Sequence, residues 1–349
     1  AERIGAGSFA DAGAGAGGER AVVAHGAWNS RRNAPRQAAP EPQRDGEPEA
    51  GREPVMDEGA QADSFVGVST PARRSAMDSL IDVIATVALD APHAVVSGEA
   101  AIAALPATRR AGSKPFAIEG YNLHTLTWES PMPGQRYGGF QAGVQLANRS
   151  GALNEIEYSE FVVKTQAFAD AINATPEFPE MLEEVSRARE LDQFASAHDA
   201  QLGFTIRARS TSWSPGFVQQ SAARLGFVAG AIPGRMVLPA TQDGLAPVLV
   251  LGFDSQAALA EDPAQAAIRD IALHLDVAQV DRSQQPFERM REVAAALAGS
   301  MDGVVTDDNG QPLTAQTMDQ IGVELQTLYA TLEQRDLAAG SLLARRLFA

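Results

Sequence analysis

The side chains best suited to metal or acid–base chemistry are few and widely spaced in this chain of 349 residues. The chain has no cysteine, so neither a disulfide nor a thiolate metal site can form. Its histidines lack the short spacings that bring two imidazoles onto one metal ion. They are His25, His93, His124, His198 and His274. The sequence therefore predicts no metal site.

Asp307 and Asp308 are adjacent carboxylates that invite a catalytic interpretation. They lie in a segment rich in turn-forming residues, where Asp, Asn and Gly favour the local backbone geometry. The sequence contains no nucleophile elbow, no P-loop and no strand-linked dinucleotide fingerprint. The glycine-rich stretch at 13–18 has neither a strand before it nor a helix after it. We therefore expect a protein that is not an enzyme, with no cofactor and no small-molecule substrate.

Composition limits the partners. The formal net charge of -16 repels phosphate backbones, and no cluster of Lys and Arg is large enough to reverse this locally. We expect no nucleic-acid partner. The length and the 45% hydrophobic content are sufficient for two domains with real cores.

The amino-terminal part divides into two segments. Residues 1–32 resemble a remnant or damaged membrane anchor at Trp28, Arg31 and Arg32, because Trp and cationic residues mark membrane interfaces. The alternative is a disordered Gly/Ala tail, since the longest uncharged stretch before Arg31 is residues 21–30 and a membrane span needs about 20 apolar residues. Residues 33–76 are rich in Pro and Glu and predict a disordered linker.

Two α+β units are expected after the linker, each with an antiparallel sheet and helices packed on one face. Strand, helix, three strands and helix follow one another twice, so we predict two such units in tandem, at 77–198 and 199–340, after a disordered tail. In the first unit, a helix at 154–173 is expected to turn Ile156 and Phe161 inward. Residues 341–349 form a basic, apolar tail.

The second unit carries a resemblance to a known family. The segments QSAARLGF, APVLVLGF and MDGVVTDDNGQPLT, within residues 199–336, are similar to the carboxyl-terminal FtsZ-binding domain of the ZipA family. The resemblance implies a split β-α-β fold and a non-enzymatic cell-division protein. Such a protein binds the carboxyl-terminal tail of FtsZ and tethers the division ring to the inner membrane during septum assembly. The 77–198 unit suggests a larger, non-enteric form, and the family implies no role for it.

The resemblance also implies an inner-membrane location, on the cytoplasmic face at the division site, through an amino-terminal anchor. If the anchor is truly absent, the expected location is cytoplasmic.

In the family, one face of the sheet packs on helices and the other forms a shallow apolar groove for the FtsZ tail. Alternation places Phe204 and Leu273 in the core and Thr205, Ala272 and His274 on the opposite face. Residues 246–255 are apolar on both faces, and we expect Val248 and Val250 to pack inward. The expected groove residues are Thr205, Arg207, Ile232, Met236, Leu249, Leu251, Phe253 and His274.

Arg207 and His274 depart from the apolar groove of enteric members. Arg207 could pair with an acidic group of the FtsZ tail, or both residues could be ordinary solvated side chains.

Two other functions stay open. One is a soluble adaptor that recognises a different extended peptide. The other is a purely structural protein whose groove is covered by the 77–198 unit or by residues 341–349, a tail that could also serve for docking or membrane contact.

Overall fold

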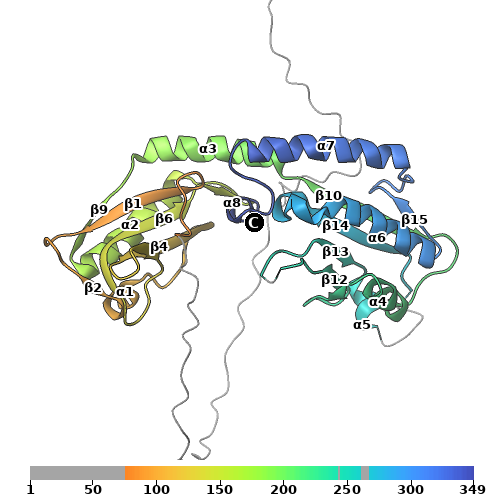
Figure 1. Cartoon of the computed structure of the whole chain (residues 1–349), viewed down its shortest axis with the longest axis horizontal. Coiled ribbons are helices and arrows are strands. Elements are labelled where there is room, and N and C mark those ends of the chain that lie inside the picture. Colours follow the sequence, from red (N-terminus) through yellow and green to blue (C-terminus); the bar gives the residue numbers. More distant parts are fainter. Residues whose placement is uncertain (1–74, 243, 261–266) are drawn as a thin grey trace, which may run out of the picture. The chain divides into compact units, whose positions relative to one another are not determined.

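The computed structural model describes residues 75–242, 244–260 and 267–349. The described residues form two compact units (Figure 1). Of the described residues, the first unit comprises 75–199 together with Gly340–Ala349, and the second unit comprises those within Ala200–Ala339. The expected anchor region 1–32 and the linker up to residue 74 lie outside the described residues. Among the helices that are described, none combines the length and apolar character that a membrane span requires.

The first unit contains an antiparallel sheet in the order β3-β4-β6-β1-β9. Short strands β2 and β5 pair with β6 and β4, and β7 and β8 form a separate ladder. The strands are β1 (Asp82–Leu89), β2 (Val96–Ser97), β3 (Arg110–Ala111), β4 (Lys114–Asn122), β5 (Thr127–Glu129), β6 (Arg136–Gln145), β7 (Ala147–Asn148), β8 (Gly151–Ala152) and β9 (Ala174–Glu177). The helices are α1 (Gly98–Ala104), α2 (Glu155–Ile172), α3 (Met181–His198) and α8 (Leu342–Leu347).

Helix α2 covers one face of this sheet. Its Phe161 and Phe168 rings pack edge-on against Phe116 of β4 and Phe140 of β6, with centroid separations of 6.0 and 5.2 Å. A capping box starts the helix: Asn154 accepts from two backbone N–H groups, and the Glu157 side chain accepts from the Asn154 N–H. Such capping satisfies backbone donors that the first helical turn leaves unpaired.

The expected inward position of Ile156 is wrong, because this side chain is 81% exposed. Glu157 takes the inward position in the first turn of α2, where it accepts hydrogen bonds from Ser113 and lies 3.6 Å from the buried Lys114 ammonium. The neighbouring Ile156 therefore points away from the sheet, since adjacent helical residues differ by about 100°.

The carboxyl-terminal tail packs into the first unit. Leu347 and Phe348 are buried, and the backbone N–H of Arg149 donates to the carbonyl oxygen of Ala349. Arg346 donates two hydrogen bonds, of 2.5 and 2.9 Å, to the Asp82 carboxylate at the start of β1. The second unit is therefore a continuous stretch of chain that separates two segments of the first.

The second unit contains an antiparallel sheet in the order β11-β12-β13-β14-β10-β15. The strands are β10 (Gln201–Ala208), β11 (Val228–Ala229), β12 (Arg235–Leu238), β13 (Leu249–Gly252), β14 (Asp270–Asp276) and β15 (Gly303–Thr306). The helices are α4 (Pro215–Ala223), α5 (Ser255–Leu259), α6 (Pro286–Ser300) and α7 (Ala315–Glu333).

Helix α6 packs on one face of this second sheet. Its Phe287 ring lies edge-on against Phe204 of β10, with 6.3 Å between centroids. Helix α7 is joined to α6 by an ion pair of 2.9 Å between Arg291 and Asp319. Ser214 and Thr314 cap α4 and α7, since their hydroxyls accept from backbone N–H groups of the first turn.

The two sheets share one topology, as the repeated order of elements predicts. Strand β1 lies between β6, the last strand of its sheet before α2, and β9, which follows α2. Strand β10 lies between β14, which precedes α6, and β15, which follows α6. This arrangement gives β6-β1-β9 in the first sheet and β14-β10-β15 in the second. The prediction of an α+β fold with antiparallel sheets is therefore confirmed.

The ion pair between Arg346 and Asp82 should hold the tail in the first unit. In Arg346→Met, the almost fully buried Asp82 carboxylate loses its cationic partner, so we expect the unit to lose about 3 kcal/mol of stability. Hydrogen exchange of the β1 amides in increasing urea measures this loss. The double variant Asp82→Leu/Arg346→Met should recover most of it, and an unchanged single variant would refute the role of the ion pair.

Phe348 should contribute packing energy to the same unit, because its side chain is 1% exposed. We expect Phe348→Ala to cost about 3–5 kcal/mol, measured by the same exchange experiment on β1. The matched control is Phe217→Ala in the second unit, where the side chain is 41% exposed. Loss of protection in the β10 amides of Phe348→Ala, with none in β1, would contradict the assignment of the tail to the first unit.

Candidate functional site

The sheet of the second unit has one face covered by helices and one face left open. The pairing of β10 with β14 sets Phe204 opposite Leu273 and Thr205 opposite Ala272. Phe204 and Leu273 are buried on the side of α6, so Thr205 and Ala272 lie on the other side. We call this other side the open face. Its residues include Thr205, Arg207, Arg235, Val237, Val250, Gly252, Asp270, Ala272 and His274.

The predicted faces of β10 and β14 are confirmed. The alternate residues expected in the core are buried, and Thr205, Arg207 and His274 lie on the open face. The buried residues are Leu202, Phe204, Ile206, Ile271, Leu273 and Leu275.

The predicted faces of β13 are wrong. Leu249 and Leu251 are 0% exposed, and Leu251 pairs directly with Leu273 of the covered face. Val250, expected in the core, pairs with His274 on the open face and is half-buried. Alternation could not decide between the two sets because both are apolar, and only the register with β14 separates them.

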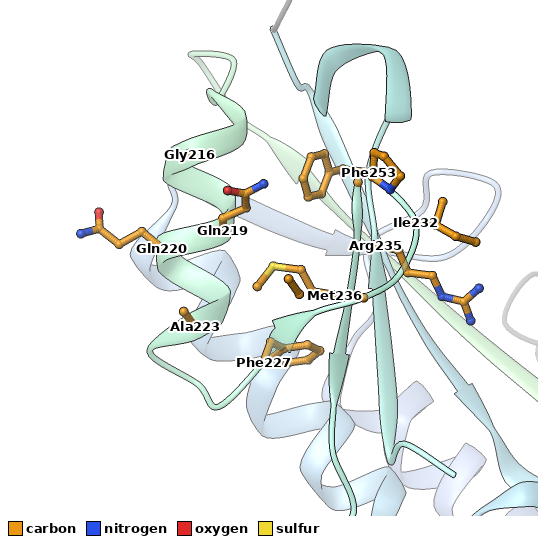
Figure 2. A pocket seen from close by; sticks show the side chains of 13 residues that line it. Gly216, Gln219, Gln220, Ala223, Phe227, Ile232, Arg235, Met236 and Phe253 are labelled. Atoms are coloured by element: carbon orange, nitrogen blue, oxygen red, sulfur yellow. The ribbon is translucent and has the colours of Figure 1, made fainter. Parts of the chain in front are cut away.

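Three predicted groove residues line a pocket at the edge of the sheet instead. Ile232, Met236 and Phe253 contribute to a hollow of about 520 Å³ beside α4 and the β11–β12 hairpin. Figure 2 shows Met236 directed from β12 toward α4 and Gln219 directed from α4 toward the strands. Ile232 and Arg235 lie on the opposite side of these strands from α4 (Figure 2). The predicted groove is thus divided among the open face, this pocket and the core.

Two neighbouring rows of residues on the open face differ in the size of their side chains. We call the row with small side chains the low floor. Gly252, Ala272 and Thr205 are direct neighbours across β13, β14 and β10, and a Cβ built on Gly252 would meet no atom within 4 Å. Val237 and Val250 form the neighbouring row. Sequence reasoning missed these two valines, and the missing signal is again the strand register. Such a floor can bury small apolar side chains of an extended ligand.

A turn borders the open face at β10. The Asp307 carboxylate accepts from the backbone N–H groups of Asn309 and Gln311, and Gly310 has a φ of 78°. A side chain at Gly310 would be strained by this φ and would also meet Arg207, whose Nη1 lies 2.8 Å from the ideal Cβ position. The segment rich in turn-forming residues therefore makes a turn at Asn309 and Gly310, and this turn packs against the predicted groove residue Arg207.

Asp308 brings a carboxyl group to the same border. The Asp308 and His274 side chains both lie beside Gly203. An ideal Cβ built on Gly203 would lie 3.4 Å from Oδ1 of Asp308 and 3.6 Å from Nδ1 of His274. Burial raises the pKa of the Asp308 carboxyl above its ordinary value, His274 opposes this increase and Asp307 adds to it. In the described part of the chain, no group of three or more His, Cys, Asp or Glu residues could hold a metal ion.

Comparison with known families concerns this second unit. Residues 259–323 match the family described as "ZipA, C-terminal FtsZ-binding domain". The matched range includes β14, α6 and β15, and therefore Ala272 and His274 of the open face. The match is to a binding domain and not to an enzyme. A search of curated proteins found no similar sequence. Residues 259–323 of the second unit are therefore similar to the FtsZ-binding domain of the ZipA family, a family of cell-division proteins.

Proposed function

We propose that the second unit binds the carboxyl-terminal tail of FtsZ on its open face. The observation that carries this proposal is the open sheet face within a unit that matches an FtsZ-binding domain family. Helices α4 and α6 lie on the other side of the sheet, so within this unit they leave these strands accessible. A short peptide gains affinity chiefly by burying a few anchors, and an uncovered sheet face can receive them.

The proposed surface differs from the one that alternation alone suggests. It keeps Thr205, Arg207 and His274, which lie on the open face. It adds Gly252 and Ala272 of the low floor, and Val237 and Val250 of the row beside it. Leu249 and Leu251 are left out because a fully buried side chain cannot contact a ligand.

The pocket beside α4 extends the proposed surface at the sheet edge. Phe253 and Met236 line it, and Ile232 of the β11–β12 connection closes one side. Met suits a surface that adapts to its ligand, because its unbranched side chain repacks at low cost. We propose that one apolar side chain of the peptide enters this pocket.

The family relation supports a role at the membrane. We propose that the protein tethers FtsZ to the cytoplasmic face of the inner membrane at the division site during septum assembly. The amino-terminal segment 1–32, where we expect the anchor, lies outside the described residues.

A second candidate function is a soluble adaptor for a different extended peptide. The observation that favours it is the presence of Arg207 and His274 on the open face, where the resemblance implies apolar residues. An exposed sheet face would bind an extended peptide in both cases, so the identity of the peptide distinguishes the two functions.

Titration of a fluorescent FtsZ tail peptide with the full chain tests the proposed function. We expect saturable binding in the micromolar range and at least a tenfold loss in Val250→Glu, because a carboxylate would be buried against the ligand. The matched control is Val323→Glu on α7, where the side chain is 63% exposed, and its affinity should be unchanged. Equal binding of a scrambled tail peptide, or no binding by a folded chain, would reject FtsZ as the ligand and favour the adaptor.

Gly252→Val tests whether the ligand occupies the low floor. The added side chain enters open space, and β-branched residues suit strands, so we expect the free protein to remain folded. The valine should block the floor and weaken peptide binding at least tenfold, as measured by fluorescence anisotropy. Unchanged affinity, with unchanged circular dichroism, would show that the peptide binds elsewhere.

A further inference from the structure

We infer that Arg235 binds a carboxylate of the peptide on the open face, so that the ligand is recognised by an acidic group as well as by apolar anchors. This inference rests on the proposed function and specifies in addition that the bound peptide carries an acidic group.

The position of Arg235 follows from strand register. It begins β12 and pairs directly with Gly252, the first residue of the low floor. Its neighbour Met236 is buried on the covered side, so the Arg235 side chain leaves β12 on the open side. Figure 2 shows Arg235 pointing away from α4, opposite to Met236. The guanidinium is therefore exposed beside the floor that we propose for the peptide.

Among the described residues, no acidic side chain pairs with Arg235. Within the described residues, its side chain makes no ion pair and no hydrogen bond. Two other arginines of the same unit have acidic partners: Arg282 lies 3.4 Å from Glu333 and Arg291 lies 2.9 Å from Asp319. The chain has 44 acidic residues against 28 Lys and Arg, so an arginine with no acidic partner among the described residues is available for an external carboxylate.

Arg207 is a weaker candidate for the same role. Asp270 lies directly opposite it on the open face, because the two residues are paired across β10 and β14. Directly opposed side chains of an antiparallel pair are near neighbours, so the negative charge of Asp270 weakens the attraction of Arg207 for an external carboxylate. Gly252 and Val250, on the strand next to Arg235, carry no charge.

The register also limits where the acidic group lies in the ligand. Arg235, Gly252, Ala272 and Thr205 form one row across four strands. Adjacent strands are about 4.8 Å apart, so the row spans about 14 Å. An extended peptide rises about 3.3 Å per residue and would cover this row with about five residues. The acidic residue of the peptide should therefore lie within about five residues of the peptide residue that contacts Thr205.

Arginine suits this recognition for two reasons. Its guanidinium can donate two parallel hydrogen bonds to a carboxylate, which fixes the direction of the peptide. Its charge also attracts the ligand before contact, so the affinity and association rate should fall as salt increases.

A charge-swap titration on the full chain tests the inference, with the FtsZ tail peptide as the probe. We expect Arg235→Glu to weaken binding at least tenfold, because attraction becomes repulsion. The matched control is Arg224→Glu, which makes the same charge change at the exposed residue that follows α4, and it should change affinity less than twofold. Peptides in which each acidic residue is replaced in turn by Lys should include one that restores binding to Arg235→Glu.

The outcomes separate this inference from the proposed function. If Val250→Glu abolishes binding while Arg235→Glu binds as the natural protein does, the open face is the site and the role of Arg235 is refuted. Weak binding of Arg235→Glu to every Lys-substituted peptide would likewise refute a direct pair. If the natural protein does not bind the tail peptide at all, the proposed function fails, and the inference fails with it.

Discussion

The contact between Phe287 of α6 and Phe204 of β10 determines which side of the second sheet can meet a partner. Strand residues alternate strictly, so a helix packed on Phe204 commits Leu273 and Leu251 to the same side through their pairing. Thr205, Ala272 and Val250 must then face outward. The open face is therefore a consequence of core packing, and a change of register by one residue would invert it.

The face of a strand can be predicted where its two sets of residues differ in polarity. Strands β10 and β14 carry Thr205, Arg207 and His274 on one side only, and their faces follow from alternation. Strand β13 is apolar on both sides, so its sequence is consistent with either face. Alternation alone therefore does not reveal that Val250 lies on the open face. Helix ends at Ser214 and Thr314 were predictable because capping is local.

Contacts between distant residues could not be predicted in this way. The pocket beside α4 requires Met236 and Phe253 to meet across the sheet edge, and the tail requires Arg346 to find Asp82. Short apolar and basic segments are compatible with several environments, including membranes and protein cores. Burial of Leu347 and Phe348 in the first unit resolves this ambiguity for the tail.

The tail contact also bears on the order of events on the ribosome. Arg346 and Asp82 are 264 residues apart, and the whole second unit is synthesised between them. At bacterial elongation rates this interval is on the order of ten seconds, long enough for the intervening unit to fold first. Strand β1 would meanwhile display its Asp82 end to chaperones and proteases. The first unit, although it is synthesised first, would thus be the last to complete its fold.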